Sequence, residues 1–131
     1  YYGHPRNAFW KIMATITSIP FDNPYTERCQ GAKKHGIALW DVIGECIRSG
    51  SLDAHIVKHS IKPNPLLDFV AKHPKLDIIA LNGATAYKLF IKHFLKDKPL
   101  HITIIQLPST SPAYTLPLSE KISQWLALLN I

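Results

Sequence analysis

Three short runs of mostly apolar residues, at positions 37–42, 76–81 and 100–107, constrain the fold of this chain more than any other feature. They do not alternate regularly between apolar and polar residues, which is typical of strands buried on both faces. Segments with helical periodicity separate them. Strands that alternate with helices form a mostly parallel sheet covered by helices, so we predict an α/β fold with three layers, α/β/α. Ligands of such folds bind at the carboxyl ends of the strands.

The segments between these runs carry helix patterns. In the first, over residues 9–16, apolar residues recur at the spacing of one helix face. A polar helix over residues 25–35 is predicted to end at Gly36, and residues 44–62 are predicted to be irregular. The apolar faces of the helices are Phe9, Ile12, Met13 and Ile16; Leu66, Leu67, Val70 and Ala71; Ala86, Leu89, Phe90 and Phe94; and Leu118, Ile122, Trp125, Leu126 and Leu129.

The length of 131 residues predicts a single domain, 1–131. No strand is predicted before the first helix, although a sheet of this kind normally carries one. Either the sheet has only three core strands or an N-terminal strand is missing from this chain, and we expect the second. No apolar run is long enough to span a bilayer, and no leader opens the chain. We therefore expect a cytoplasmic protein with no membrane contact.

The charge balance favours an anionic partner. Fifteen Lys and Arg against nine Asp and Glu give a net charge of +6. In so small a domain, this positive net charge favours nucleic acid over other anionic partners. Cys29 and Cys46 are too few for a zinc or iron–sulfur site. His55 and His59 have the spacing of helix-borne ligands but no third ligand nearby, so we predict no metal.

The first ten residues place aromatic rings, an amide and a cation in a turn that leads into the first helix. Pro5 suits a first helical turn, and Gly3 permits a close approach of the backbone. Asn7 is therefore expected at or near the start of the helix. Two interpretations stay open: Asn7 or His4 is a helix cap, or the two residues belong to a polar site.

Five blocks occur in order over nearly the whole chain: residues 4–10 (HPRNAFW), 39–42 (LWDV), 50–53 (GSLD), 82–83 (NG) and 107–112 (LPSTSP). Together they resemble the hypoxanthine-DNA glycosylase branch of the uracil-DNA glycosylase superfamily. The first block is also similar to the His-Pro-x-Asn-x-Phe-Trp segment of mismatch-specific uracil-DNA glycosylases. The resemblance implies a monofunctional enzyme that flips a damaged or mismatched base out of double-stranded DNA. It would hydrolyse the N-glycosidic bond of hypoxanthine, or of uracil, and leave an abasic site without a metal or cofactor.

The resemblance implies a catalytic role for Asn7, whose amide carbonyl would orient the attacking water while its NH2 group is fixed by the loop. His4 would support Asn7 or donate to a phosphate, or it simply fills the turn. The block after the third strand matches the motif that holds the phosphate backbone and supplies a wedge at the vacated stack. In this chain that block is Leu107, Pro108, Ser109, Thr110 and Ser111.

Three further residues are candidates for the base pocket. Tyr1 and Tyr2 would stack on an extruded base, or they cover the core at the helix start. Asn82 would read a base edge with its paired donor and acceptor, or it belongs to an ordinary turn before Gly83.

This sequence departs from the family pattern in three places. Leu107 stands where the superfamily often has His or Asn before Pro-Ser, and Tyr114 stands where the branch usually has Asn. The superfamily's first motif, on the opening strand, is absent from this chain, which leaves the base preference open. The main alternative is therefore a catalytically impaired, DNA-binding relative. In either case we expect a monomer associated with the nucleoid.

Overall fold

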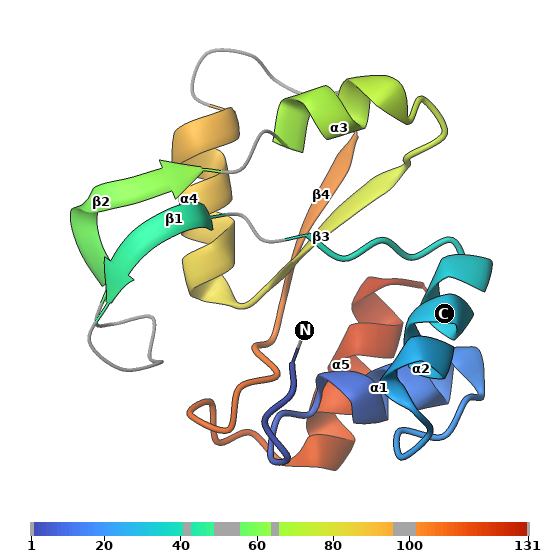
Figure 1. The fold of residues 1–131 in the computed structure, drawn as a ribbon. Coiled ribbons are helices and arrows are strands. Elements are labelled where there is room, and N and C mark those ends of the chain that lie inside the picture. Colours follow the sequence, from blue (N-terminus) through green and yellow to red (C-terminus); the bar gives the residue numbers. More distant parts are fainter. Residues whose placement is uncertain (1, 41–42, 49–55, 64–65, 96–101, 131) are drawn as a thin grey trace. The chain divides into compact units, whose positions relative to one another are not determined.

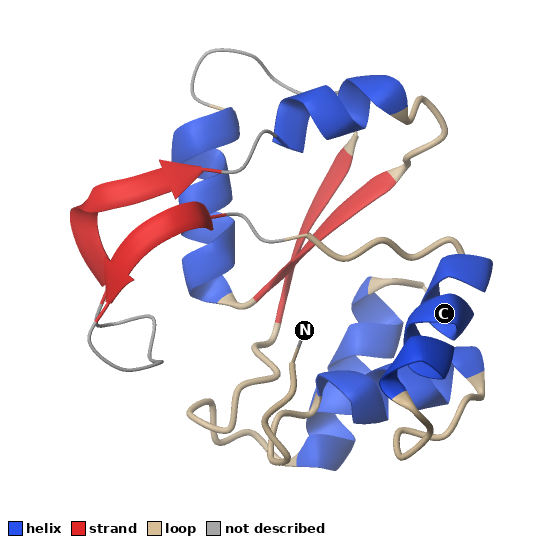
Figure 2. Ribbon diagram, in the orientation of Figure 1, coloured by secondary structure: helices blue, strands red, loops and turns tan. Residues whose placement is uncertain are grey.

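The computed structural model describes residues 2–40, 43–48, 56–63, 66–95 and 102–130. Its internal contacts divide the chain into two compact units. We call Tyr1–Leu39 with Leu107–Ile131 the helical unit, and Trp40–Gln106 the strand unit. The elements, labelled in Figure 1 and coloured by type in Figure 2, are α1 (Phe9–Thr17), α2 (Tyr25–Lys34), β1 (Ile43–Arg48), β2 (Ile56–Pro63), α3 (Leu66–Lys72), β3 (Ile78–Asn82), α4 (Ala84–Phe94), β4 (Thr103–Leu107) and α5 (Leu118–Leu128).

The helical unit is built around α1, which contacts both α2 and α5. Phe9, Ile12 and Met13 are buried, as the spacing of apolar residues in this helix predicts. The ring of Phe9 meets the rings of Trp10 and Trp125 edge to face, with centroids 5.0 and 6.1 Å apart. Such aromatic pairs stabilise a core by roughly 0.5–1.5 kcal/mol beyond the area they bury.

The strand unit contains β3, α4 and β4, in which the two strands form a parallel pair. The helix α4 packs on β3, and a core of Leu66, Leu81, Phe90 and Phe94 lies between the elements. The turn from β3 into α4 depends on Gly83, whose φ of +100° is rarely adopted by residues with a side chain. The predicted strands at 76–81 and 100–107, and the helix between them, are confirmed to within a few residues. The α/β class is therefore confirmed.

The prediction of an irregular segment over residues 44–62 was wrong for residues 44–48 and 56–62, while residues 49–55 lie outside the described part of the chain. Within it β1 and β2 form an antiparallel pair, with Ile47 opposite Val57 and Glu45 opposite Lys62. The register shifts on both sides of Glu45. A shifted register breaks the period-two pattern that identifies a strand, so the sequence shows no clean alternation there.

The predicted buried strand at 37–42 was also wrong for residues 37–40, which form neither strand nor helix. Residues 41 and 42 lie outside the described part of the chain. Trp40 is exposed, and its ring contacts that of Phe69 on α3, with centroids 4.6 Å apart. A short apolar run can cover a neighbouring element instead of pairing as a strand, and sequence alone does not distinguish the two. The described strands thus form two separate two-stranded sheets, while the three-layer arrangement and the single domain stay predictions.

Candidate active site

Asn7 lies in a turn that local hydrogen bonds define almost completely. The backbone N–H of Asn7 donates to the carbonyl of His4 at 3.0 Å. The N–H of Arg6 donates to Nδ1 of the His4 ring at 3.1 Å. A neutral imidazole that accepts at Nδ1 carries its proton on Nε2, so the exposed His4 side chain keeps one donor for a ligand. His4 therefore shapes the turn through its backbone and its ring together.

The side chain of Asn7 closes the turn onto the helix. Its Oδ1 accepts a hydrogen bond of 2.9 Å from the N–H of Phe9, the first residue of α1. That N–H has no acceptor within the helix, which is why a side-chain oxygen takes it. Ala8, not Asn7, is the N-cap residue. The expected arrangement, with the NH2 group fixed by the loop, is thus reversed. The bond holds the carbonyl, and it leaves one lone pair of Oδ1 and the Nδ2 hydrogens available.

The loop after β4 is bound to the rest of the helical unit through its carbonyl groups. The carbonyl of Thr110 accepts from the N–H of Ala8 at 2.9 Å, which ties this loop directly to the Asn7 turn. From α5, Nε1 of Trp125 donates to the carbonyl of Pro108 at 2.8 Å, and Nζ of Lys121 donates to that of Ser111 at 3.0 Å. Two blocks at opposite ends of the chain therefore meet in one place.

The loop's side chains divide into buried and available groups. Thr110 is fully buried and Leu107 is only 2% exposed, so neither side chain lies on the loop surface where a wedge or a phosphate contact belongs. Ser109 and Ser111 are half-buried. Their Oγ atoms accept from the backbone N–H groups of Ser111 and Ala113, at 3.1 and 3.2 Å. Each hydroxyl still has its own hydrogen to donate, which suits an anionic ligand.

The candidates for a base pocket are spread over both units. The ring of Tyr2 packs on Phe9, with centroids 4.1 Å apart, so Tyr2 covers the core at the helix start. Its φ of +59° is unusual for a bulky residue. Tyr1 lies outside the described residues. Asn82 ends β3 in the strand unit and is half-buried, as expected for a residue at a strand end. Its position relative to Asn7 is not described.

Lys121 is a site residue that the sequence analysis missed. It lies on α5 one turn before Trp125 and is only 4% exposed. Its ammonium lies 5.4 Å from the centre of the Tyr114 ring, and burial lowers the pKa of Lys121 below its ordinary value. The available signal was a lysine four residues before a buried tryptophan, on the apolar face of a helix.

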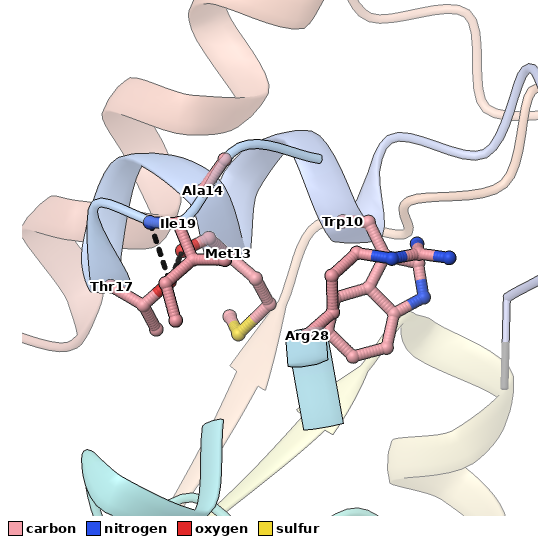
Figure 3. Close-up of a pocket in the computed structure, with 6 residues that line it drawn as sticks. All are labelled: Trp10, Met13, Ala14, Thr17, Ile19 and Arg28. Carbon is pink, nitrogen blue, oxygen red and sulfur yellow. Dashed lines mark hydrogen bonds between the residues drawn. The ribbon is translucent and has the colours of Figure 1, made fainter. Parts of the chain in front are cut away.

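A second feature of the helical unit is a shallow pocket lined by Trp10, Met13, Ala14, Thr17, Ile19 and Arg28, shown in Figure 3. The guanidinium of Arg28 lies 4.8 Å from the Trp10 ring centre and 5.4 Å from that of Tyr25. The Oγ1 of Thr17 donates to the Met13 carbonyl and accepts from the N–H of Ile19. The lining has no carboxylate or imidazole, so it does not resemble a hydrolytic site.

Among the residues that the structure describes, no group of three His, Cys, Asp or Glu side chains is placed to hold a metal ion. Cys29 is a free, half-buried thiol. Within the same ranges, no helix has the length and apolar character needed to cross a membrane.

The fold and the site thus define an α/β protein. In it, the turn that carries Asn7 at the start of α1 is hydrogen-bonded to the serine-containing loop that follows β4.

The chain is 30% identical over 131 residues to a protein of Methanosarcina acetivorans named hypoxanthine DNA glycosylase. That match covers 99% of this chain and 79% of the relative. A protein of the same name from Methanosarcina barkeri is 33% identical over 84 residues, which cover 63% of this chain and only about half (52%) of that relative. No family model matches the chain, and neither does any solved structure. The chain belongs to the hypoxanthine DNA glycosylase family.

Proposed function

We propose that this protein is a DNA glycosylase that removes a deaminated base, hypoxanthine ahead of uracil, and leaves an abasic site. The observation that carries the proposal is the 2.9 Å bond between Ala8 and Thr110, which brings the Asn7 turn and the serine loop into one site. The names of the two relatives support hypoxanthine as the base. The proposed substrate is double-stranded DNA, the proposed active form is a cytoplasmic monomer, and the reaction needs no cofactor.

Cleavage of the glycosidic bond places positive charge on the sugar and negative charge on the departing base. Fixed dipoles aimed at these charges lower the barrier, because they need no reorganisation during the reaction. Asn7 supplies such a dipole, since its Oδ1 is held by the Phe9 N–H. In our proposal the second lone pair of Oδ1 orients the attacking water, and the Nδ2 hydrogens donate to the departing base.

The serine loop and the net charge supply the contacts to DNA. The hydroxyls of Ser109 and Ser111 each keep a hydrogen that can bond a phosphate oxygen, and His4 offers Nε2 on the neighbouring turn. The loop enters the complex already ordered, because its carbonyl groups are bound to α1 and α5. Tyr1, Tyr2 and Asn82 stay proposals for the pocket that receives the flipped base.

The test is incubation of the protein with duplexes that contain one deoxyinosine or one deoxyuridine, followed by alkaline cleavage at abasic sites. We expect product from deoxyinosine, and none from an undamaged duplex. A folded protein that forms no product from either base refutes the proposal. DNA binding without product would establish the alternative, a non-catalytic relative. Asn23→Ala, which makes the same side-chain change in the loop between α1 and α2, is the matched control for Asn7→Ala.

A further inference from the structure

Lys121 is a buried residue whose ammonium makes a part-buried hydrogen bond and has no described counter-ion. The residue is 4% exposed, and its ammonium contacts the Ser111 carbonyl and the face of the Tyr114 ring. No carboxylate in the described ranges forms an ion pair with it. A buried charge is costly unless an opposite charge compensates it, and a carbonyl dipole compensates only part.

The site that this cation supports is the serine loop. Lys121 holds the Ser111 carbonyl, so the ammonium lies next to the residue whose hydroxyl, with that of Ser109, is available for an anion. One ammonium hydrogen is used by this bond, and two remain. A positive charge beneath hydroxyl donors is an arrangement that favours a phosphate group.

We infer that Lys121 is a positioning residue for a phosphodiester of the DNA backbone, which it attracts by its charge and orients through the Ser109–Ser111 loop. This inference rests on the proposed function, and it adds a residue of α5 that does not contact the base. The lowered pKa of Lys121, caused by burial, agrees with a cation that lacks its anionic partner in the free protein.

The loop offers a matched comparison, because Trp125 also holds it but without charge. Lys121→Met removes the charge and the bond to Ser111, whereas Lys121→Gln removes the charge and keeps a donor. Trp125→Phe removes the bond to the Pro108 carbonyl and part of the ring that packs on Phe9, but it removes no charge. Lys33→Met removes an exposed lysine of α2 and controls for net charge.

The measurement is the affinity for an undamaged duplex as a function of salt, which does not depend on catalysis. We expect Lys121→Met and Lys121→Gln to bind about tenfold more weakly or worse. The slope of log affinity against log salt should fall by about one, the value for one lost phosphate contact. Trp125→Phe and Lys33→Met should leave the slope unchanged. Thermal unfolding of Lys121→Met should occur at an equal or higher temperature, because an apolar side chain replaces a buried charge.

Unchanged slopes in both Lys121 variants overturn the inference, and so does an equal fall in Lys33→Met, which would make net charge the cause. The glycosylase assay separates this result from the proposed function. If the wild-type protein forms product and the Lys121 variants have unchanged slopes, only the role of Lys121 is refuted and the glycosylase proposal stands. A fall in slope without any product refutes the glycosylase proposal and leaves the phosphate contact in place.

Discussion

Replacing Asn7 by aspartate and by alanine separates the two tasks that the structure gives to this amide. Aspartate keeps an oxygen that accepts from the Phe9 N–H, but it lacks the Nδ2 hydrogens and carries a negative charge. Alanine removes both the acceptor and the donors. Both variants should therefore lose activity, alanine at least as much as aspartate, and only alanine should lose stability.

The magnitudes follow from the 2.9 Å bond to Phe9 and from the proposed contact with the base. Loss of a side-chain acceptor at a helix start costs about 0.5–2 kcal/mol of unfolding free energy. At this chain length, each kcal/mol of unfolding free energy that is lost should lower the melting temperature by about 3–5 °C. The carboxylate introduced by Asn7→Asp keeps this bond and gains roughly 0.3–1 kcal/mol from the helix dipole. Loss of a fixed dipole at the reacting centre costs about 2.7–4 kcal/mol of transition-state stabilisation, a factor of 10² to 10³ in rate.

Single-turnover cleavage of a deoxyinosine duplex and thermal unfolding by circular dichroism measure the two effects. We expect Asn7→Asp to lose about 10² to 10³ in rate, in line with the loss of the positioned donors, and Asn7→Ala to lose at least as much. Only Asn7→Ala should melt at a lower temperature, and Asn23→Ala should retain the wild-type rate. A wild-type rate in Asn7→Asp would refute the use of the Nδ2 donors. An equal loss of stability in both variants would refute the bond to Phe9.

Three further predictions concern other parts of the molecule. The double variant Ser109→Ala and Ser111→Ala should bind duplex DNA more weakly with an unchanged salt slope, because both hydroxyls are neutral; a changed slope in a filter-binding titration would contradict this. The pKa of Lys121 is lower in the folded chain than its ordinary value of 10.5, which the unfolded chain retains. At a pH between these two pKa values, the unfolded chain therefore binds more protons than the folded chain. Its contribution to the free energy of unfolding therefore rises with pH across this window, and urea unfolding should show that Lys121→Met lacks the rise. Gly83→Ala should destabilise the protein by roughly 1–2 kcal/mol in the same assay, since φ is +100° there; an unaltered midpoint would argue against this turn.

Much of the fold is readable from local patterns. The spacing of Phe9, Ile12 and Met13 locates α1 and its buried face, and the apolar run before Asn82 locates β3. The β1–β2 pair could not be predicted, because its register shifts hide the alternation that identifies a strand. The exposed Trp40 shows the opposite error: an apolar run that looks like a strand but is not one at residues 37–40.

The same division applies to the candidate site. Local sequence is enough to specify the Asn7 turn, because His4, Asn7 and Phe9 are neighbours whose hydrogen bonds close over two or three residues. It also places the chain in its family, through blocks whose order can be read without any knowledge of contacts. The bond from Ala8 to Thr110 and the burial of Lys121 beneath the serine loop, in contrast, exist only in the folded chain. The bond from Ala8 to Thr110 joins distant parts of the sequence, which the aromatic packing of α1 against α5 brings together. The burial of Lys121 depends on how the serine loop folds back on α5.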